Sequence, residues 1–209
     1  GQKWDGSHDV SALLRSTDQG KSWTRVEVPN STGCVHMNIV PASNDKLLAF
    51  FRSRWADFIY TTHSVDGGLT WAAPVPTSLP NNNSSIQALR LNDGRLAMIF
   101  NHSSALNATE RRASLYDELE DDAASNDDAQ SSSTTHERRA FWGAPRAPMT
   151  LALSDDDGQT WPWMRNLEVG DGYCMSNDSA RHINREYSYP SLRQTADGAL
   201  HVAYTVYRQ

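Results

Sequence analysis

Short apolar runs alternate with polar turns along most of the chain. The same order occurs three times: 39–40, an Asn-Asp turn and 47–51; 86–91, Asn-Asp-Gly and 95–100; and 190–194, Ala-Asp-Gly and 199–207. Asn-Asp and Asp-Gly between apolar alternating runs are strong β-hairpin signals. The pattern therefore predicts three hairpins, each of which opens a repeated β unit.

An eight-residue pattern, Ser-x-Asp-x-Gly-x-x-Trp, also occurs three times, at 16–23, 64–71 and 154–161. Its Asp can accept hydrogen bonds from the backbone N–H groups of a turn, its Gly suits a positive φ, and its Trp can anchor the turn on adjoining strands. Four fixed positions recur together in each copy, which argues against three accidental polar loops. We interpret the pattern as a strand-joining turn.

These turns resemble the Asp-box, or bacterial neuraminidase repeat, of sialidases and related β-propellers. The resemblance implies that each repeat is a four-stranded blade, in which the Asp-box turn joins the third strand to the outer one. The implied fold class is all-β, a sialidase-like β-propeller of the six-bladed type. Within the superfamily, the runs VHMNIVPASNDKLLAFFRSR and REYSYPSLRQTADGALHVAYT look closest to the predicted-neuraminidase branch.

The spacing of the boxes indicates an insertion. The first two boxes begin at Ser16 and Ser64, whereas the third begins much later, at Ser154. The segment 103–143 accounts for the excess, and its centre is acidic and rich in Ser, Ala and Asn. Such a composition buries too little apolar surface to order itself. We expect this segment to be a largely disordered insertion in one partial propeller that spans 1–209.

The register also predicts an incomplete arc. Residues 8–15 form a third strand with no first or second strand before it, and 207–209 end a second strand. The chain would then hold two whole blades and two half blades, where the family closes a ring of about six. It looks like the C-terminal part of a longer protein, although the remaining blades could belong to another chain or be lost from a truncated gene model.

Composition excludes some classes of function. The formal net charge is −6, with 25 acidic against 19 Lys and Arg residues, which disfavours nucleic-acid binding. No apolar run is long enough to span a membrane. The seven histidines show no metal-ligand spacing, and we predict neither a metal nor a cofactor. Cys34 and Cys174 precede first strands of different blades and could pair.

Six Asn-x-Ser/Thr sequons favour a secreted or extracellular glycoprotein, although Asn-rich loops generate such triplets by themselves. They are at Asn30, Asn82, Asn83, Asn101, Asn107 and Asn177.

Strand direction decides which side chains can meet. In an antiparallel blade, the starts of the first and third strands share one edge with the end of the second, and the Asp boxes lie at the other edge. We therefore expect the boxes to be scaffold and the opposite edge to hold the site. The substrate-binding candidates at that edge are His36, Arg52, Arg54, Asn83, Gln87, Asn101, Arg146, Tyr187 and Arg208.

The run from Glu186 to Leu192, EYSYPSL, suggests the chemistry. It resembles the Tyr-Ser-x-Leu signature at the start of the last inner strand of sialidases, where the Tyr, activated by a Glu, is the nucleophile. Measured back from the leucine, Tyr189 takes that place, with Glu186 as the catalytic carboxylate. Tyr187 is the second choice. The alternative is that these tyrosines only pack at the start of a blade.

The arginines complete the resemblance, because planar guanidinium groups bind the carboxylate of a sugar acid well. Sialidases use three, and Arg52, Arg54, Arg208 and Arg146 are within reach of the site. Two departures weaken it: the segment 82–87 lacks the family's Glu, and Asn101 stands where an Arg is expected. The resemblance implies an exo-glycoside hydrolase for a terminal acidic sugar of the sialic acid, Kdn or Kdo type. The alternative is a non-catalytic carbohydrate-binding or scaffolding propeller, or an inactive fragment.

Overall fold

The computed structural model describes residues 6–43, 45–108, 138–170 and 185–208. In these ranges the chain forms a series of β-strands and one short 3-10 helix, η1 (Ala105–Asn107). The strands are β1 (Ala12–Arg15), β2 (Thr24–Glu27), β3 (Cys34–Pro41), β4 (Leu47–Ser53), β5 (Phe58–Ser64), β6 (Val75–Pro80), β7 (Gln87–Arg90), β8 (Leu96–Asn101), β9 (Met149–Ser154), β10 (Trp163–Glu168), β11 (Arg185–Gln194) and β12 (Leu200–Arg208).

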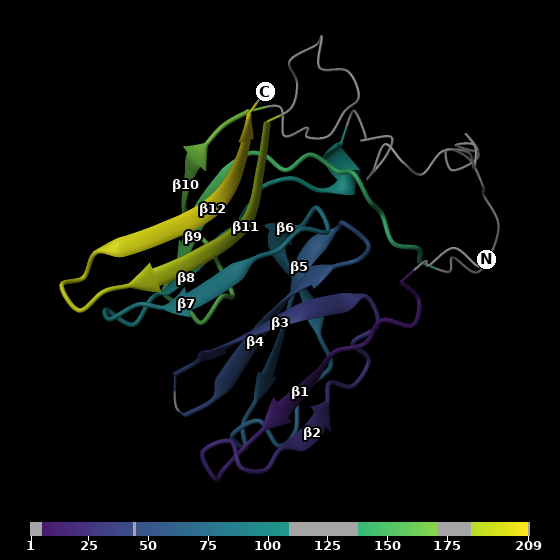
Figure 1. Ribbon diagram of the computed structural model, residues 1–209, viewed down its shortest axis with the longest axis vertical. Helices are drawn as coiled ribbons and strands as arrows, with labels where there is room; N and C mark the ends of the chain where they lie inside the picture. Colours follow the sequence, from purple (N-terminus) through teal and green to yellow (C-terminus); the bar gives the residue numbers. More distant parts are fainter. Residues whose placement is uncertain (1–5, 44, 109–137, 171–184, 209) are drawn as a thin grey trace.

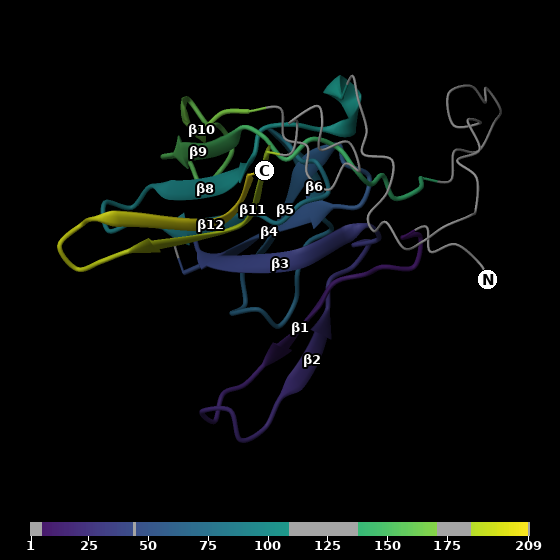
Figure 2. The same cartoon turned by 45° about the horizontal axis from the view of Figure 1, so that its top comes forward.

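The strands form the predicted blades. Two four-stranded antiparallel sheets, β3-β4-β5-β6 and β7-β8-β9-β10, lie between two-stranded sheets β1-β2 and β11-β12. Figure 1 shows the sheets following one another as an arc, and Figure 2 shows the β1-β2 pair projecting from the β3 end of it. The prediction of two whole and two half blades is therefore confirmed.

Two inner strands begin earlier than the sequence predicted. β3 starts at Cys34 and β11 at Arg185, each several residues before the apolar run that was expected to define it. In both strands the pairing register shifts, between Val35 and Asn38 in β3 and between Ser188 and Ser191 in β11. A bulge of this kind interrupts the alternation of side chains, which is why the apolar pattern marked only the residues beyond it.

Three hydrophobic clusters fill the spaces between successive blades. β8 shows how one strand serves two of them, since all of its residues are buried. Met98 and Phe100 belong to the cluster shared with β3–β6, whereas Ala97 and Ile99 belong to the cluster shared with β11 and β12. Alternate residues of a strand point to opposite faces, so an inner blade must be apolar on both.

The Asp boxes make the hydrogen bonds that their composition predicts. In the second box the Ser64 hydroxyl donates to Asp66 (2.8 Å), and Asp66 accepts from the backbone N–H (2.9 Å) and hydroxyl (2.5 Å) of Thr70. The Thr70 hydroxyl and N–H hold the pKa of Asp66 below its ordinary value. Gly68, at φ 85°, has the positive φ expected of the motif. The box is a turn closed by its own Ser and Asp, although the buried Nε1 of Trp71 has no hydrogen-bond partner among the described residues.

The three box tryptophans differ in environment. Trp71 and Trp161 are 6% and 5% exposed and lie in hydrophobic clusters, and Trp161 packs edge-on against Phe50 with ring centroids 6.1 Å apart. Trp23 is 59% exposed. The prediction that the Trp anchors each turn thus holds for the second and third boxes and is wrong for the first, whose ring has no neighbouring blade to cover it among the described residues.

The expected insertion lies mostly at 109–137, outside the described residues. Its two flanks contact the arc. The backbone N–H of Ala105 donates to Ala56 (2.7 Å), and that of Phe141 donates to Arg54 (2.8 Å). The chain therefore leaves and rejoins the propeller at fixed places.

The structure also bears on the expectations about cysteines, glycosylation sequons and membrane spans. Cys34 is a buried free thiol, while Cys174 lies outside the described residues. Sequon residues Asn82, Asn83 and Asn101 are each at most 4% exposed, which is too little to carry a glycan. Asn30 is exposed. None of the described segments forms a helix with the length and hydrophobicity needed to cross a membrane.

Candidate functional site

The inner strands carry a repeated irregularity at the predicted site edge. His36, Asn83 and Tyr189 have φ of 54°, 57° and 51°, in the left-handed region that side-chain-bearing residues seldom adopt. Each stands three residues before an Ile or Leu, so the three occupy equivalent places in successive blades. A bulge at such a place re-aims the side chain. All three lie beside arginines of the site.

Arg52 is the buried centre of this arginine group. It is the penultimate residue of β4 and is 8% exposed. Its Nε donates to Asn83 Oδ1 (3.0 Å), and its Nη1 lies 3.4 Å from His36 Nδ1. Among the described residues no carboxylate forms an ion pair with it. Burial, followed by the positive charges of Arg54 and Arg146, lowers the pKa of Arg52 to about 10. It remains a cation at neutral pH, in a place where a cation is costly.

Arg54 lies beside Arg52 on the same side of the sheet. Its Nε donates to Asp9 Oδ2 (2.7 Å), and its Nη1 is 3.5 Å from the same Asn83 oxygen. Asn83 turns its Nδ2 to the carbonyl of Phe141 (2.9 Å). The Asn83 amide therefore joins two neighbouring guanidinium groups to the C-terminal flank of the insertion.

Arg146 approaches the same edge from the other side. Its Nη1 donates to Glu186 and to the Ser188 hydroxyl (3.1 Å), and its guanidinium carbon lies 5.6 Å from the centre of the Tyr189 ring. Glu186 is 8% exposed and Ser188 1%, whereas Tyr189 is 62% exposed. The tyrosine is thus the group of this cluster that is presented to solvent.

His36 lies close enough to the arginines for their charges to affect its pKa. Its ring is partly buried, and burial, with the charges of Arg52 and Arg54, lowers the pKa of His36 below its ordinary value. A bound anion would oppose both charges. We therefore expect the pKa of His36 to rise when an anion binds beside the arginines.

The remaining predicted residues hold blades together. Asn101 donates from Nδ2 to the Tyr187 carbonyl (3.0 Å), and the Gln87 side chain accepts the N–H of Leu192. Tyr187 is 3% exposed, and its hydroxyl donates to the Val169 carbonyl (3.1 Å). These contacts are structural, and they leave Tyr189 as the tyrosine that can face a ligand. The side chain of Arg208 lies outside the described residues.

Sequence reasoning missed three residues of the cluster. Asp9 lies within the predicted strand 8–15 but before the start of β1, and Trp142 lies within the expected insertion 103–143. Trp142 covers Arg54 and Arg52 at 5.2 and 6.0 Å from its ring centre. Ser188 lies within the EYSYPSL run and was signalled by the Tyr-Ser pair, but its bond to Glu186 depends on the bulge that follows.

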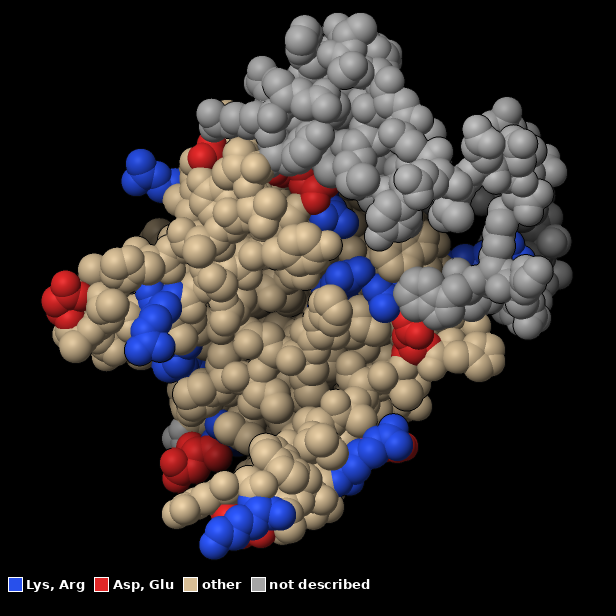
Figure 3. Space-filling model, viewed as in Figure 1, with Lys and Arg blue, Asp and Glu red and all other residues tan. Residues whose placement is uncertain are grey.

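Lysine and arginine side chains gather near the middle of the molecular face in Figure 3, with acidic side chains beside them. Within the described residues, no group of three or more His, Cys, Asp or Glu side chains could hold a metal ion. The cluster therefore offers guanidinium groups, amides and a phenol, which suit an anionic ligand with hydroxyl groups.

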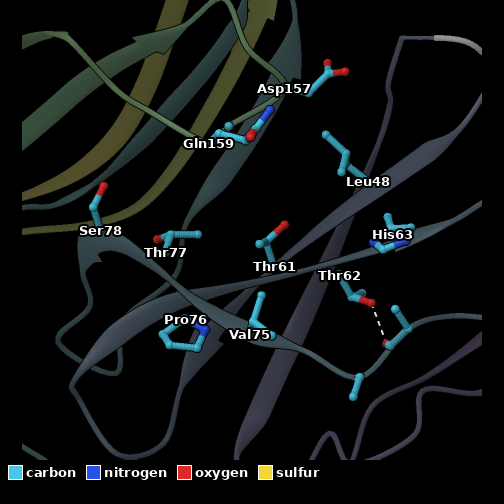
Figure 4. Close-up of a pocket in the computed structure, with 13 residues that line it drawn as sticks. Leu48, Thr61, Thr62, His63, Val75, Pro76, Thr77, Ser78, Asp157 and Gln159 are labelled. Atoms are coloured by element: carbon cyan, nitrogen blue, oxygen red, sulfur yellow. Dashed lines mark hydrogen bonds between the residues drawn. The ribbon is translucent and has the colours of Figure 1, made fainter.

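A second hollow lies elsewhere. A groove of about 550 Å³ runs between β5, β6 and the third Asp-box turn. Figure 4 shows Thr61, Thr77 and Gln159 around it, and Thr62 bonded to a backbone carbonyl (2.5 Å). Its acidic residue, Asp157, is already paired with Arg90. None of the predicted site residues lines it.

Solved structures with the same arrangement of strands are sialidases. A leech intramolecular trans-sialidase, solved with 2,7-anhydro-Neu5Ac, matches 94% of this chain at 16% identity with a TM-score of 0.60. The intramolecular trans-sialidase of Ruminococcus gnavus, in complex with oseltamivir carboxylate, matches 94% of this chain at 17% identity with a TM-score of 0.59. The NanB sialidase of Streptococcus pneumoniae matches 99% at 14% identity and 0.62. At these identities the likeness establishes the fold alone.

The chain spans only part of these proteins, covering 24%, 34% and 25% of their respective lengths. A search of curated protein sequences found no significant match. The family model of the BNR repeat-like domain matches residues 3–202, which is nearly the whole chain. Together with the three Asp boxes and the blades that they close, this match places the chain in the BNR repeat-like family.

Proposed function

We propose that the protein is a sialidase-like exo-glycoside hydrolase that acts on a terminal acidic sugar. One observation carries the proposal: Arg52 is a buried guanidinium with no ion-pair partner among the described residues, beside Arg54 and Arg146 and close to the exposed Tyr189. A buried charge without a counter-ion is costly. A carboxylate ligand would supply that counter-ion.

The charge balance of the cluster supports an anion. Two described carboxylates face the three arginines, Asp9 on Arg54 and Glu186 on Arg146. The cluster therefore carries an excess of positive charge, in a chain whose formal net charge is −6. A local positive field in a negative protein favours a specific small anion over general binding of polyanions.

Tyr189 is the proposed nucleophile. Its phenolic oxygen gives its proton to a carboxylate, Glu186 or another, and bonds to the anomeric carbon as the bond to the leaving glycosidic oxygen breaks. An acid protonates that oxygen, and water then hydrolyses the glycosyl-tyrosine and restores the phenol. A neutral nucleophile suits this substrate, because a carboxylate would be repelled by the acid group of the sugar.

A second candidate function, non-catalytic binding of acidic glycans, also has support. Glu186 already accepts hydrogen bonds from Arg146 and Ser188, and no described carboxylate is hydrogen-bonded to the Tyr189 hydroxyl. Asn101 occupies the place expected of an arginine and serves to join two blades. A protein that kept the arginines but lost the proton acceptor would bind without turnover.

Fluorogenic sialoside, Kdn and Kdo substrates tested on the full-length protein separate the two. The hydrolase proposal expects release of the fluorophore and its loss in Tyr189→Phe, which removes one oxygen from an exposed ring. Tyr187→Phe is the matched control, because its buried hydroxyl bonds only to a backbone carbonyl among the described residues. Full activity in Tyr189→Phe would exclude the assigned nucleophile. Binding of acidic sugars without hydrolysis would support the second function.

A further inference from the structure

Two guanidinium groups that lie side by side repel each other, and something must hold them together. Arg52 and Arg54 share Asn83 Oδ1 as an acceptor, yet Arg52 has no described counter-ion. The shared acceptor is neutral, so it removes little of the repulsion. Asp9 forms an ion pair with Arg54 (2.7 Å).

Trp142 lies over both groups. The centre of its ring is 5.2 Å from the guanidinium carbon of Arg54 and 6.0 Å from that of Arg52. The negative face of an indole attracts cations at such distances, and Trp provides the strongest attraction of the aromatic side chains. The ring also excludes water from one face of the guanidinium groups, so their donors remain available at the edges.

The backbone around Trp142 is fastened along its length. Phe141 donates to the Arg54 carbonyl and accepts from Asn83, so the residue before the tryptophan is tied to both arginine-bearing strand and amide. On one side Arg138 donates to the Tyr60 hydroxyl (3.0 Å), and on the other Asn82 donates to the Pro145 carbonyl (2.7 Å). The position of the ring is therefore set by the fold.

We propose that Trp142 is a positioning residue, which holds Arg52 and Arg54 parallel so that their N–H edges form one clamp for the carboxylate of an acidic sugar. This inference rests on the proposed acidic-sugar site. It assigns a role to the C-terminal flank of the insertion, because that flank brings the indole to the arginines. Among the described residues none accepts a hydrogen bond from Nη2 of Arg52, which leaves this nitrogen available to a ligand.

The test compares two replacements of Trp142 in the full-length protein. Trp142→Leu keeps an apolar side chain but removes the aromatic face. Trp142→Phe keeps an aromatic face, although a smaller one. Affinities for N-acetylneuraminic acid and Kdo are measured by calorimetry, with galactose as the neutral sugar. We expect a loss of about tenfold for the acids in Trp142→Leu and of about threefold or less in Trp142→Phe, the value of two cation–π contacts. Trp163→Leu, in the exposed strand β10, is the control.

A second readout distinguishes positioning from general damage. Burial lowers the pKa of His36, and the charges of Arg52, whose Nη1 lies 3.4 Å from His36 Nδ1, and of Arg54 lower it further. Guanidinium groups that separate in Trp142→Leu should therefore let part of that shift disappear, and the pKa should rise in an NMR titration. In Trp142→Phe it should stay low.

The outcomes distinguish a failure of the role of Trp142 from a failure of the proposed acidic-sugar site. Wild-type acid binding that is lost in Arg52→Ala but unchanged in Trp142→Leu, with His36 unmoved, overturns the role of Trp142 alone. Acid binding that Arg52→Ala leaves unchanged, or that the wild type lacks, overturns the proposed acidic-sugar site. A loss in Trp142→Leu that Phe does not restore, with an unshifted His36 pKa, also contradicts positioning and indicates a structural role.

Discussion

The three Asp boxes provide a matched test of what the motif's tryptophan contributes to stability. Trp161 is 5% exposed and packs on Phe50, whereas Trp23 occupies the same place in its box and is 59% exposed. Replacing each by Ala changes the same atoms in the same turn. The two rings differ in burial, and the Trp23 Nε1 donates to the Gly20 carbonyl (3.1 Å), whereas the buried Trp161 Nε1 has no hydrogen-bond partner among the described residues. The difference between the two free energies of unfolding therefore reports mainly the packing against the next blade.

The magnitude follows from the buried area. A tryptophan buries about 150–250 Å², which at about 25 cal/mol per Å² amounts to roughly 4–6 kcal/mol for a ring as covered as Trp161. The extended-chain reference makes that an upper estimate, and measured Trp→Ala costs in cores are about 3–5 kcal/mol. Trp23, with less than half of its surface covered, should cost about 1–2 kcal/mol on the same scale. Trp71→Ala should resemble Trp161→Ala, because it is 6% exposed.

Urea unfolding followed by circular dichroism measures these changes, with the m-value as a check that the variants unfold in the same way. Equal losses for Trp23→Ala and Trp161→Ala, or a loss below about 1 kcal/mol for Trp161→Ala, would refute the reasoning, because a ring in a core costs several times more.

Three further outcomes are expected. Arg52→Ala should weaken binding of carboxylate-bearing sugars by about 1.5–3 kcal/mol, the value of a hydrogen bond to a charged group, and leave neutral sugars unaffected in the same calorimetric titration. Gly33→Ala should lower the free energy of unfolding in urea by about 2–4 kcal/mol, because the added Cβ would clash with the Trp55 ring and φ is +77°. Gly94→Ala is the control: nothing lies within 4 Å of its added Cβ, so it should show only the cost of a positive φ. The pKa of Asp66 is lowered from 3.8 in the folded protein, so its contribution is present at neutral pH and lost as the pH falls through 3.8 and below; a stability gap between wild type and Asp66→Asn that persists unchanged in acid would contradict this.

The fold was predictable because its signals are local. Asp-Gly turns, period-two alternation and the Asp-box turn each operate within about ten residues, so the order of strands followed from the sequence. What failed depended on distant residues. The exposure of Trp23 is set by whether another blade covers it, and the early starts of β3 and β11 are set by bulges that break the alternation.

The site was predictable in part for the same reason. Arg52 and Arg54 end a predicted second strand, so strand direction placed them at the edge where the structure brings the arginines together. That rule cannot tell a residue that faces a ligand from one that joins two blades, which is why Gln87 and Asn101 stood beside them as candidates. Trp142 carried no such signal, because its place depends on where the insertion rejoins the arc.

The left-handed residues explain why the site lies at this edge. A side-chain-bearing residue in this conformation costs about 1–2 kcal/mol, and such strain persists only where the surroundings impose it. Here it recurs at equivalent places in three successive blades, at His36 in β3, at Asn83 before β7 and at Tyr189 in β11, and each residue lies beside an arginine. Asn adopts this conformation more readily than Tyr, yet the chain keeps a tyrosine in it and leaves that ring exposed. Trp23 shows that a ring can also be exposed because no described blade covers it. The turnover of Tyr189→Phe therefore decides whether this exposed phenol serves the proposed site.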